Sequence, residues 1–159
     1  MTPLFNVDEI KNYECHEHNA FKSKRAGVSE HIGAKKLSYS IAVVPPGHKV
    51  CPFHNHRVNE EMFLILEGEG TLRYGEKQYP IRKNDIIACP PGGREHAHQI
   101  MNTGVTDIRY LCLSTNEPNE ICEYPDSNKM LAMVGGSSET AFRHIANMED
   151  DVDYFLGEN

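Results

Sequence analysis

Two histidines in the first half of the chain, His54 and His56, lie two residues apart, and Glu61 follows closely. Side chains alternate faces along an extended strand, so histidines with this spacing point the same way. A helix would need a spacing of three or four to align them. The flanking residues also favour strands, since Val50, Phe53, Phe63 and Ile65 are β-formers. Pro45-Pro46-Gly47 disfavours a helix just upstream.

Short apolar segments separated by glycine and proline turns continue along the chain. We expect strands at residues 37–44, 61–66, 71–74, 79–81, 85–88, 98–102, 107–114 and 129–134. Such a series predicts an all-β protein, an antiparallel barrel or jelly roll. No internal repeat is visible, so we expect a single barrel.

Three regions are expected within the 159 residues, a length that fits one domain. Residues 1–36 are polar and mixed in charge and are expected to form an N-terminal arm or cap. The barrel is expected over residues 37–115. Residues 116–159 are looser and are expected to pack on the barrel as a C-terminal extension, with Tyr154-Phe-Leu156 as an anchor on the barrel or on a partner subunit.

A further histidine, His98, lies about forty residues beyond the first two. The set His54, His56, Glu61 and His98 offers three imidazoles and one carboxylate, a ligand set for one divalent transition metal. Imidazole suits Zn, Cu, Fe and Ni, and the carboxylate admits Mn, so the residue types do not name the ion.

These residues fall into two motifs that resemble those of the cupin superfamily. The first runs Gly47, His54-x-His56, Glu61 and Gly68, with one more residue than usual between Gly47 and His54. The second runs Asp85, Pro91-Gly-Gly93, a histidine and Asn102, and Asn84 stands where the usual motif has glycine. The resemblance implies a jelly-roll barrel that binds a metal. It is closest to small single-domain cupins, which are sometimes labelled sugar-phosphate isomerase-like.

Two histidines compete for the last ligand position of the second motif. His96 fits the short spacing from the proline-glycine turn, and His98 fits the spacing to Asn102. We favour His98, because the apolar pattern sets the register of the strand and extra residues are easier to place in the turn. His96 then becomes a candidate catalytic base near the rim, together with Glu60, which competes with Glu61 for the carboxylate role.

Other side chains are candidates for contacting a substrate. Arg94 lies in the loop beside the second motif and could pair with a carboxylate or phosphate. Tyr39 and Tyr110 carry hydroxyls that could orient a ligand, or they could line the core.

Composition limits the class of protein. A net charge of −7 argues against nucleic acid and against anionic membrane surfaces. No stretch of about 20 apolar residues could span a membrane, and the first residues lack a signal sequence. The five cysteines are odd in number and lack paired spacing, which favours a reducing, cytoplasmic compartment.

These observations lead to one main hypothesis and one alternative. The first is a metal-dependent cupin enzyme acting on a small polar, anionic or sugar-like metabolite, with isomerase-type or oxygenase-type chemistry. The alternative is a non-catalytic cupin that binds a small molecule or stores metal. The resemblance also implies a homodimer, with residues 37–44 or the N-terminal arm as the exchanged edge.

Overall fold

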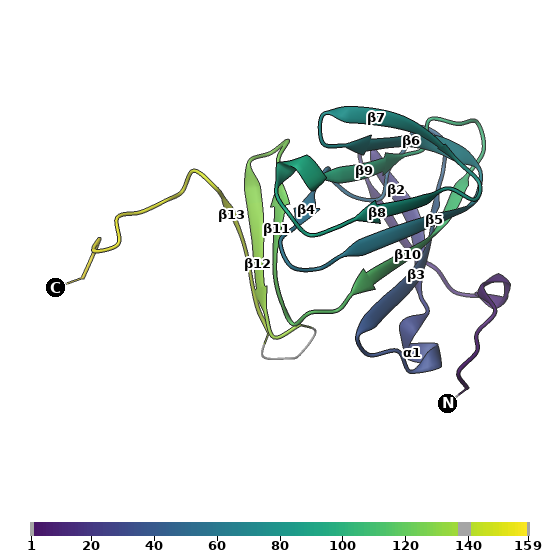
Figure 1. The fold of residues 1–159 in the computed structure, drawn as a ribbon, viewed down its shortest axis with the longest axis horizontal. Helices are drawn as coiled ribbons and strands as arrows, with labels where there is room; N and C mark the ends of the chain where they lie inside the picture. The colour runs from purple at the N-terminus through teal and green to yellow at the C-terminus, as the bar shows by residue number, and fades with distance from the viewer. Residues whose placement is uncertain (1, 137–140, 159) are drawn as a thin grey trace.

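The computed structural model describes residues 2–136 and 141–158, and it is built almost entirely of strands (Figure 1). The N-terminal part holds the short helical turn η1 (Val7–Glu9), β1 (Glu14–His18), β2 (Phe21–Gly27), α1 (Ser29–Ile32) and β3 (Leu37–Val44). The middle holds β4 (Asn55–His56), β5 (Glu61–Glu67), β6 (Glu69–Tyr74), β7 (Lys77–Arg82), β8 (Ile86–Cys89), η2 (Arg94–His96), β9 (His98–Met101) and β10 (Ile108–Thr115). The C-terminal part holds β11 (Asn119–Tyr124), β12 (Lys129–Val134) and β13 (Phe142–Asn147).

The strands form a six-stranded sheet in the order β1-β2-β3-β10-β5-β8, which faces the three-stranded ladder β7-β6-β9. A third group, β13-β12-β11-β4, lies beside one end of the barrel. The neighbouring strands pair antiparallel, as in a jelly roll. The predicted all-β jelly-roll fold is therefore confirmed.

The N-terminal region contributes more than an arm. Its residues 14–27 form β1 and β2, and β2 pairs with β3 from Lys24 opposite Val43 onward. Consequently Leu37–Val44 is enclosed between β2 and β10 and offers no free edge for exchange with a partner. Within one chain the free edge on this side of the sheet is therefore β1, and the homodimer stays a prediction.

The core lies between the six-stranded sheet and the three-stranded ladder. Alternate residues of each strand point inward, which is the period expected for a sheet with one buried face. The cluster consists of Ala42, Val44, Phe63, Ile65, Leu72, Ile81, Ile87, Cys89, Ile100, Ile108 and Tyr110. This apolar floor supports the polar residues that the same strands carry nearer the open end.

Two tight turns of the barrel depend on left-handed backbone. Gly68 has φ of 78°, and a Cβ there would lie 2.4 Å from the carbonyl oxygen of Asp107, so glycine is required. Asn84 has φ of 74°. Asparagine is the non-glycine residue that tolerates this conformation best, so its place in the second motif preserves the turn.

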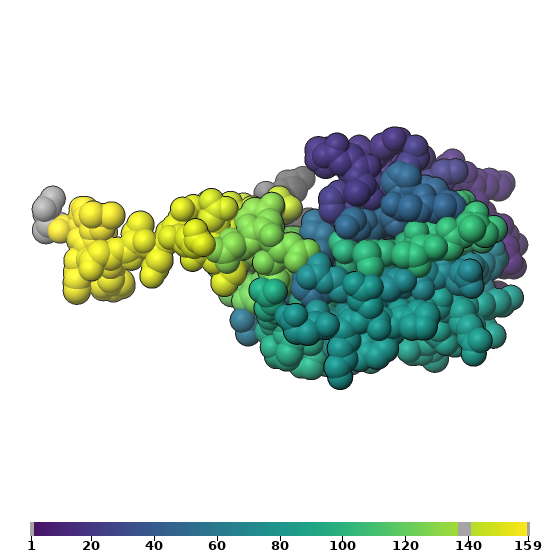
Figure 2. Space-filling model, turned by 90° about the horizontal axis from the view of Figure 1, so that it is seen from above, coloured from purple at the N-terminus to yellow at the C-terminus, as the bar shows by residue number. Residues whose placement is uncertain are grey.

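The C-terminal segment after β13 leaves the barrel as an extended tail (Figures 1 and 2). Tyr154, Phe155 and Leu156 are 86%, 70% and 70% exposed. The expected anchor therefore does not pack on its own barrel, although β11 of the same extension pairs with β4. Packing on a partner subunit stays a prediction.

Candidate metal centre

Strand pairing brings the two histidine motifs together. The segment 54–56 runs between β9 and β11: His54 forms a two-hydrogen-bond bridge with His98, and His56 pairs with Cys122. Glu61 begins β5, where it lies between Cys89 of β8 and Ser114 of β10. Residues far apart in the sequence thus meet at one end of the barrel.

Three imidazoles surround one carboxylate oxygen. The Nε2 atoms of His98, His56 and His54 lie 3.0, 3.3 and 3.6 Å from Oε2 of Glu61. All four side chains are largely enclosed, from 3% exposed for His98 to 19% for His56. The structure therefore brings His98 to Glu61, together with both histidines of the first motif.

The far side of each ring is held by an acceptor. Nδ1 of His54 lies 2.9 Å from the carbonyl oxygen of Pro52, and Nδ1 of His98 lies 3.1 Å from that of His96. Nδ1 of His56 lies 3.3 Å from a carboxylate oxygen of Glu120. Carbonyl and carboxylate oxygens only accept, so each Nδ1 donates outward and each ring directs its Nε2 toward Glu61, where that nitrogen could bind a metal.

A carboxylate surrounded by three imidazoles favours a positive charge among them, either a proton on a ring or a bound cation. Nε2 of His56 is buried and has no hydrogen-bond partner among the described residues. Burial opposes ionisation of Glu61, but the three imidazoles around its carboxylate outweigh this effect and hold its pKa well below the ordinary value. The ionised carboxylate and the inward Nε2 atoms are the donors that a divalent transition metal takes. His54, Glu61 and His98 have ligand atoms close enough to share one ion, and His56 borders the same carboxylate.

Glu120 on β11 organises the first motif, and sequence reasoning missed it. Its carboxylate is buried and accepts hydrogen bonds from the backbone N–H groups of Arg57, Val58 and Asn59, besides the contact with His56. The signal was available in the period-two series Glu120, Cys122, Tyr124, because these three share one face of a strand. The sequence analysis instead treated residues 116–159 as a looser extension, with a strand expected only at 129–134.

Cys122 is the second residue that the sequence analysis missed. It is buried, and its sulfur joins His54 and His56 in a second group of ligand atoms that lie within 4.8 Å of one another. Tyr124 follows on the same face, with its ring 6.4 Å from that of His54. Burial raises the pKa of both Cys122 and Tyr124, so each keeps its proton near neutral pH.

The two candidate catalytic residues, Glu60 and His96, and the candidate substrate-binding Arg94 are not among the converging ligand atoms. Glu60 is exposed, as the strand neighbour of an inward Glu61 should be. Nδ1 of His96 instead lies 2.9 Å from the hydroxyl of Tyr74. Arg94 is 61% exposed and lies 3.5 Å from a carboxylate oxygen of Glu76. None of the three has a ligand atom in the groups described above.

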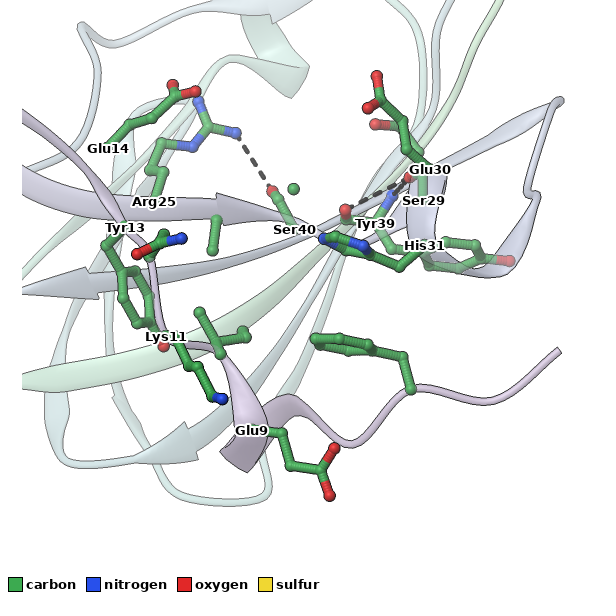
Figure 3. Close-up of a pocket in the computed structure, with 16 residues that line it drawn as sticks. Glu9, Lys11, Tyr13, Glu14, Arg25, Ser29, Glu30, His31, Tyr39 and Ser40 are labelled. Atoms are coloured by element: carbon green, nitrogen blue, oxygen red, sulfur yellow. Dashed lines mark hydrogen bonds between the residues drawn. The ribbon is translucent and has the colours of Figure 1, made fainter. Parts of the chain in front are cut away.

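The two candidate tyrosines also lie apart from the converging histidines. Tyr110 is 3% exposed and packs edge-on against Phe63, whose ring lies 5.6 Å from that of His98. It belongs to the core below the site. Tyr39 lines a different pocket of about 670 Å³ between the N-terminal segment and strands β2 and β3, which Figure 3 shows with Ser29 and His31.

A smaller cavity of about 210 Å³ opens beside Glu61. Its walls are mostly polar and come from β2, β3, β10 and the loops that follow β4 and β10. The lining residues are Arg25, Ser38, Ser40, Asn59, Glu61, Cys112, Ser114, Thr115, Asn116, Glu117 and Met133. Of the four converging residues, Glu61 lines this cavity.

A jelly-roll barrel that carries three histidines and a glutamate at one end defines a class of metal-binding barrel proteins. The sequence profile of the Cupin domain family matches residues 40–114. An uncharacterized protein of Methanocaldococcus jannaschii is 35% identical over 92 residues, which are 55% of this chain and 70% of that protein. The chain belongs to the cupin family.

Two further similarities bear on the fold and the site. The oxalate-binding protein of Thermotoga maritima is 36% identical over 70 residues, 44% of this chain and 54% of that protein. A crystal structure from Acidithiobacillus ferrooxidans, named "putative sugar phosphate isomerase", superimposes with a TM-score of 0.82 at 22% identity and covers 96% of both chains. That likeness extends the shared fold over the N- and C-terminal regions.

Among the described residues, no helix has the length and apolar character needed to cross a membrane.

Proposed function

We propose that this protein is a metal-dependent cupin that binds a small polar anion at one divalent transition metal held by His54, His56, Glu61 and His98. The observation that carries the proposal is the convergence of three Nε2 atoms on one oxygen of Glu61. The orphaned Nε2 of His56 supports it, because a buried acceptor without a partner is costly.

A bound metal would act as a Lewis acid or as a centre for oxygen chemistry. The protein groups around it have separate tasks. Glu120 and the carbonyls of Pro52 and His96 hold the rings in place. Tyr124 lies beside His54 and can donate a hydrogen bond to a ligand oxygen.

The choice between reaction classes depends on the availability of a base. Isomerisation needs a protein group that accepts a proton from carbon. His96 is engaged with Tyr74, and Glu60 is exposed, so neither candidate base is placed beside the cluster. We therefore propose oxygenase-type chemistry as the first class to assay and isomerase-type chemistry as the second. The names of the two similar proteins suggest dicarboxylates and sugar phosphates as the first substrates to test.

The deciding experiment is elemental analysis of the purified protein and of two variants. We expect about one equivalent of a transition metal in the wild type and in His144→Ala, whose histidine is exposed on β13. The His98→Ala variant should lose most of it, since one of four ligands is gone. Equal metal in His98→Ala, or none in the wild type after anaerobic reconstitution, would reject the proposal.

Activity then separates the enzyme from the non-catalytic alternative. The metal-loaded protein is mixed with each substrate class, and oxygen uptake and exchange of carbon-bound hydrogen for deuterium are followed. Binding without either reaction would favour a binding or storage protein.

A further inference from the structure

The cavity beside Glu61 has one cationic wall, which comes from Arg25 on β2. Arg25 stands opposite Ala42 in the register of β2 and β3, and directly opposed residues project from the same face of a sheet. Ala42 points into the core, so Arg25 also starts on the inward face. One of its terminal nitrogens donates to the hydroxyl of Ser40 at 3.3 Å (Figure 3).

The strands beside Arg25 change from apolar to polar as they approach the open end. On β3, Ser38 and Ser40 continue the inward series of Ala42 and Val44. On β10, Ser114 continues the series of Ile108 and Tyr110, and it stands opposite Ser38. The barrel therefore ends in a ring of hydroxyls with a guanidinium at its edge.

The charge of Arg25 is available for a ligand. Each of Arg57, Arg73, Arg94 and Arg109 lies within 3.5 Å of a carboxylate oxygen. Arg25 forms no such ion pair within the described parts of the chain, and its cross-strand neighbour Glu14 lies 3.8 Å from His16 instead. A guanidinium presents five N–H donors, and among the described residues Arg25 uses one of its terminal nitrogens in a hydrogen bond, to Ser40.

We propose that Arg25 binds the anionic group of the substrate, a carboxylate or a phosphate, while another oxygen of the same molecule approaches the metal. This inference rests on the proposed function and narrows its substrate class. A guanidinium binds both oxyanions with paired hydrogen bonds. A volume of about 210 Å³ lies below the ~300–1,000 Å³ of sites for drug-sized ligands, so the substrate is a compact metabolite.

Two carboxylates, those of Glu61 and Glu117, line the cavity and could repel an anionic ligand. Glu117 is exposed at the rim, whereas Glu61 is directed to the three histidines. Without a metal the charge of Glu61 repels an anion. The affinity for an anion should therefore be higher in metal-loaded protein than in metal-free protein.

The test uses calorimetric titration of the full chain with three probes, in metal-loaded and metal-free form. Malonate presents carboxylates, 2-phosphoglycolate adds a phosphate, and malonamide is the neutral control. We expect Arg25→Gln to weaken one or both anions by about 10- to 100-fold, the range for a hydrogen bond to a charged group. Arg25→Lys should retain part of the affinity. Arg82→Ala removes an exposed charge on β7 and should change nothing.

The outcomes distinguish this inference from the proposed function. Metal content is measured for every sample, and thermal melting checks that each variant is folded. Unchanged anion affinity in Arg25→Gln at equal metal content would overturn the role of Arg25 alone. An equal loss in Arg82→Ala, or no anion binding by the wild type in either form, would also overturn it. A wild type without metal would reject the metal proposal, while loss of 2-phosphoglycolate binding in Arg25→Gln would still support Arg25.

Discussion

The carboxylate of Glu120 lies 3.3 Å from Nδ1 of His56 and caps the backbone of the three residues that follow this histidine. The C-terminal extension thereby fixes the orientation of a ring in the first histidine motif. Partners of this kind hold metal-binding imidazoles in place.

Replacing Glu120 with Gln should weaken metal binding by about 10- to 100-fold, because His56 loses a charged acceptor. A competition titration against a chelator measures this change. Glu69→Gln, at an exposed position on β6 outside the cavity, is the matched control. An affinity equal to that of the wild type would mean that Glu120 only stabilises the turn.

His96→Ala should keep about one equivalent of metal, in contrast to His98→Ala. The reason is that the ring of His96 contacts Tyr74, whereas Nε2 of His98 lies 3.0 Å from Glu61. Elemental analysis of both variants side by side decides the register of the second motif. Loss of metal in His96→Ala alone would reverse the assignment.

Asp126 should make the stability depend on pH. Its hydrogen bonds to Arg73 lower the pKa of the carboxyl, and the two N···O distances are 2.6 and 2.9 Å. The pKa of the Asp126 carboxyl is lower in the folded state than the unfolded value near 3.9, so its ionised form stabilises the fold at pH values above about 3.9. This contribution to the free energy of unfolding is lost as the pH falls through the folded-state pKa. The pair is partly exposed, so we expect less than about 1 kcal/mol.

Thermal melts of the wild type and Asp126→Asn from pH 7 to pH 3 test this expectation. The difference in Tm should be largest above about pH 5 and shrink below about pH 4. A constant difference across this range would mean that the charge of Asp126 plays no part.

Gly68→Ala should lower the free energy of unfolding by at least about 1–3 kcal/mol, the cost of a strained left-handed residue. The added Cβ also meets the carbonyl oxygen of Asp107. Gly27→Ala is the control, because nothing lies within 4 Å of a Cβ at that position. Equal denaturation midpoints for the two variants would show that the β5–β6 turn can relax.

The exposed tail should take part in self-association. Tyr154, Phe155 and Leu156 carry a large apolar surface away from the barrel, and a second copy would bury it (Figure 2). We expect a dimer by light scattering and a monomer when these three residues are replaced with serine. A variant that remains a dimer would move the interface elsewhere, for example to the edge of β1.

The sequence determined most of the barrel, because its signals are local. Alternation of apolar residues between glycine and proline turns located Leu37–Val44 and Lys129–Val134 at the bounds that the structure has. The histidine spacing and the positions of Glu61 and His98 likewise identified the residues that converge. The strands β1, β2 and β13 were missed, since their polar residues hide the period of two, and β11 was missed because its inward series begins with a charged residue, Glu120.

Tertiary structure alone decided what surrounds these residues. Glu120 and Cys122 reach the histidines because β11 pairs with β4, and no local pattern specifies which strand a distant segment joins. Arg25 lines the cavity because β2 pairs with β3, whereas Arg94, adjacent to the motif in sequence, lies 3.5 Å from Glu76. The sequence by itself thus determined most strands of the barrel and the histidines that meet at Glu61. Non-local strand pairing decided that Glu120 contacts His56 and that Arg25 lines the cavity.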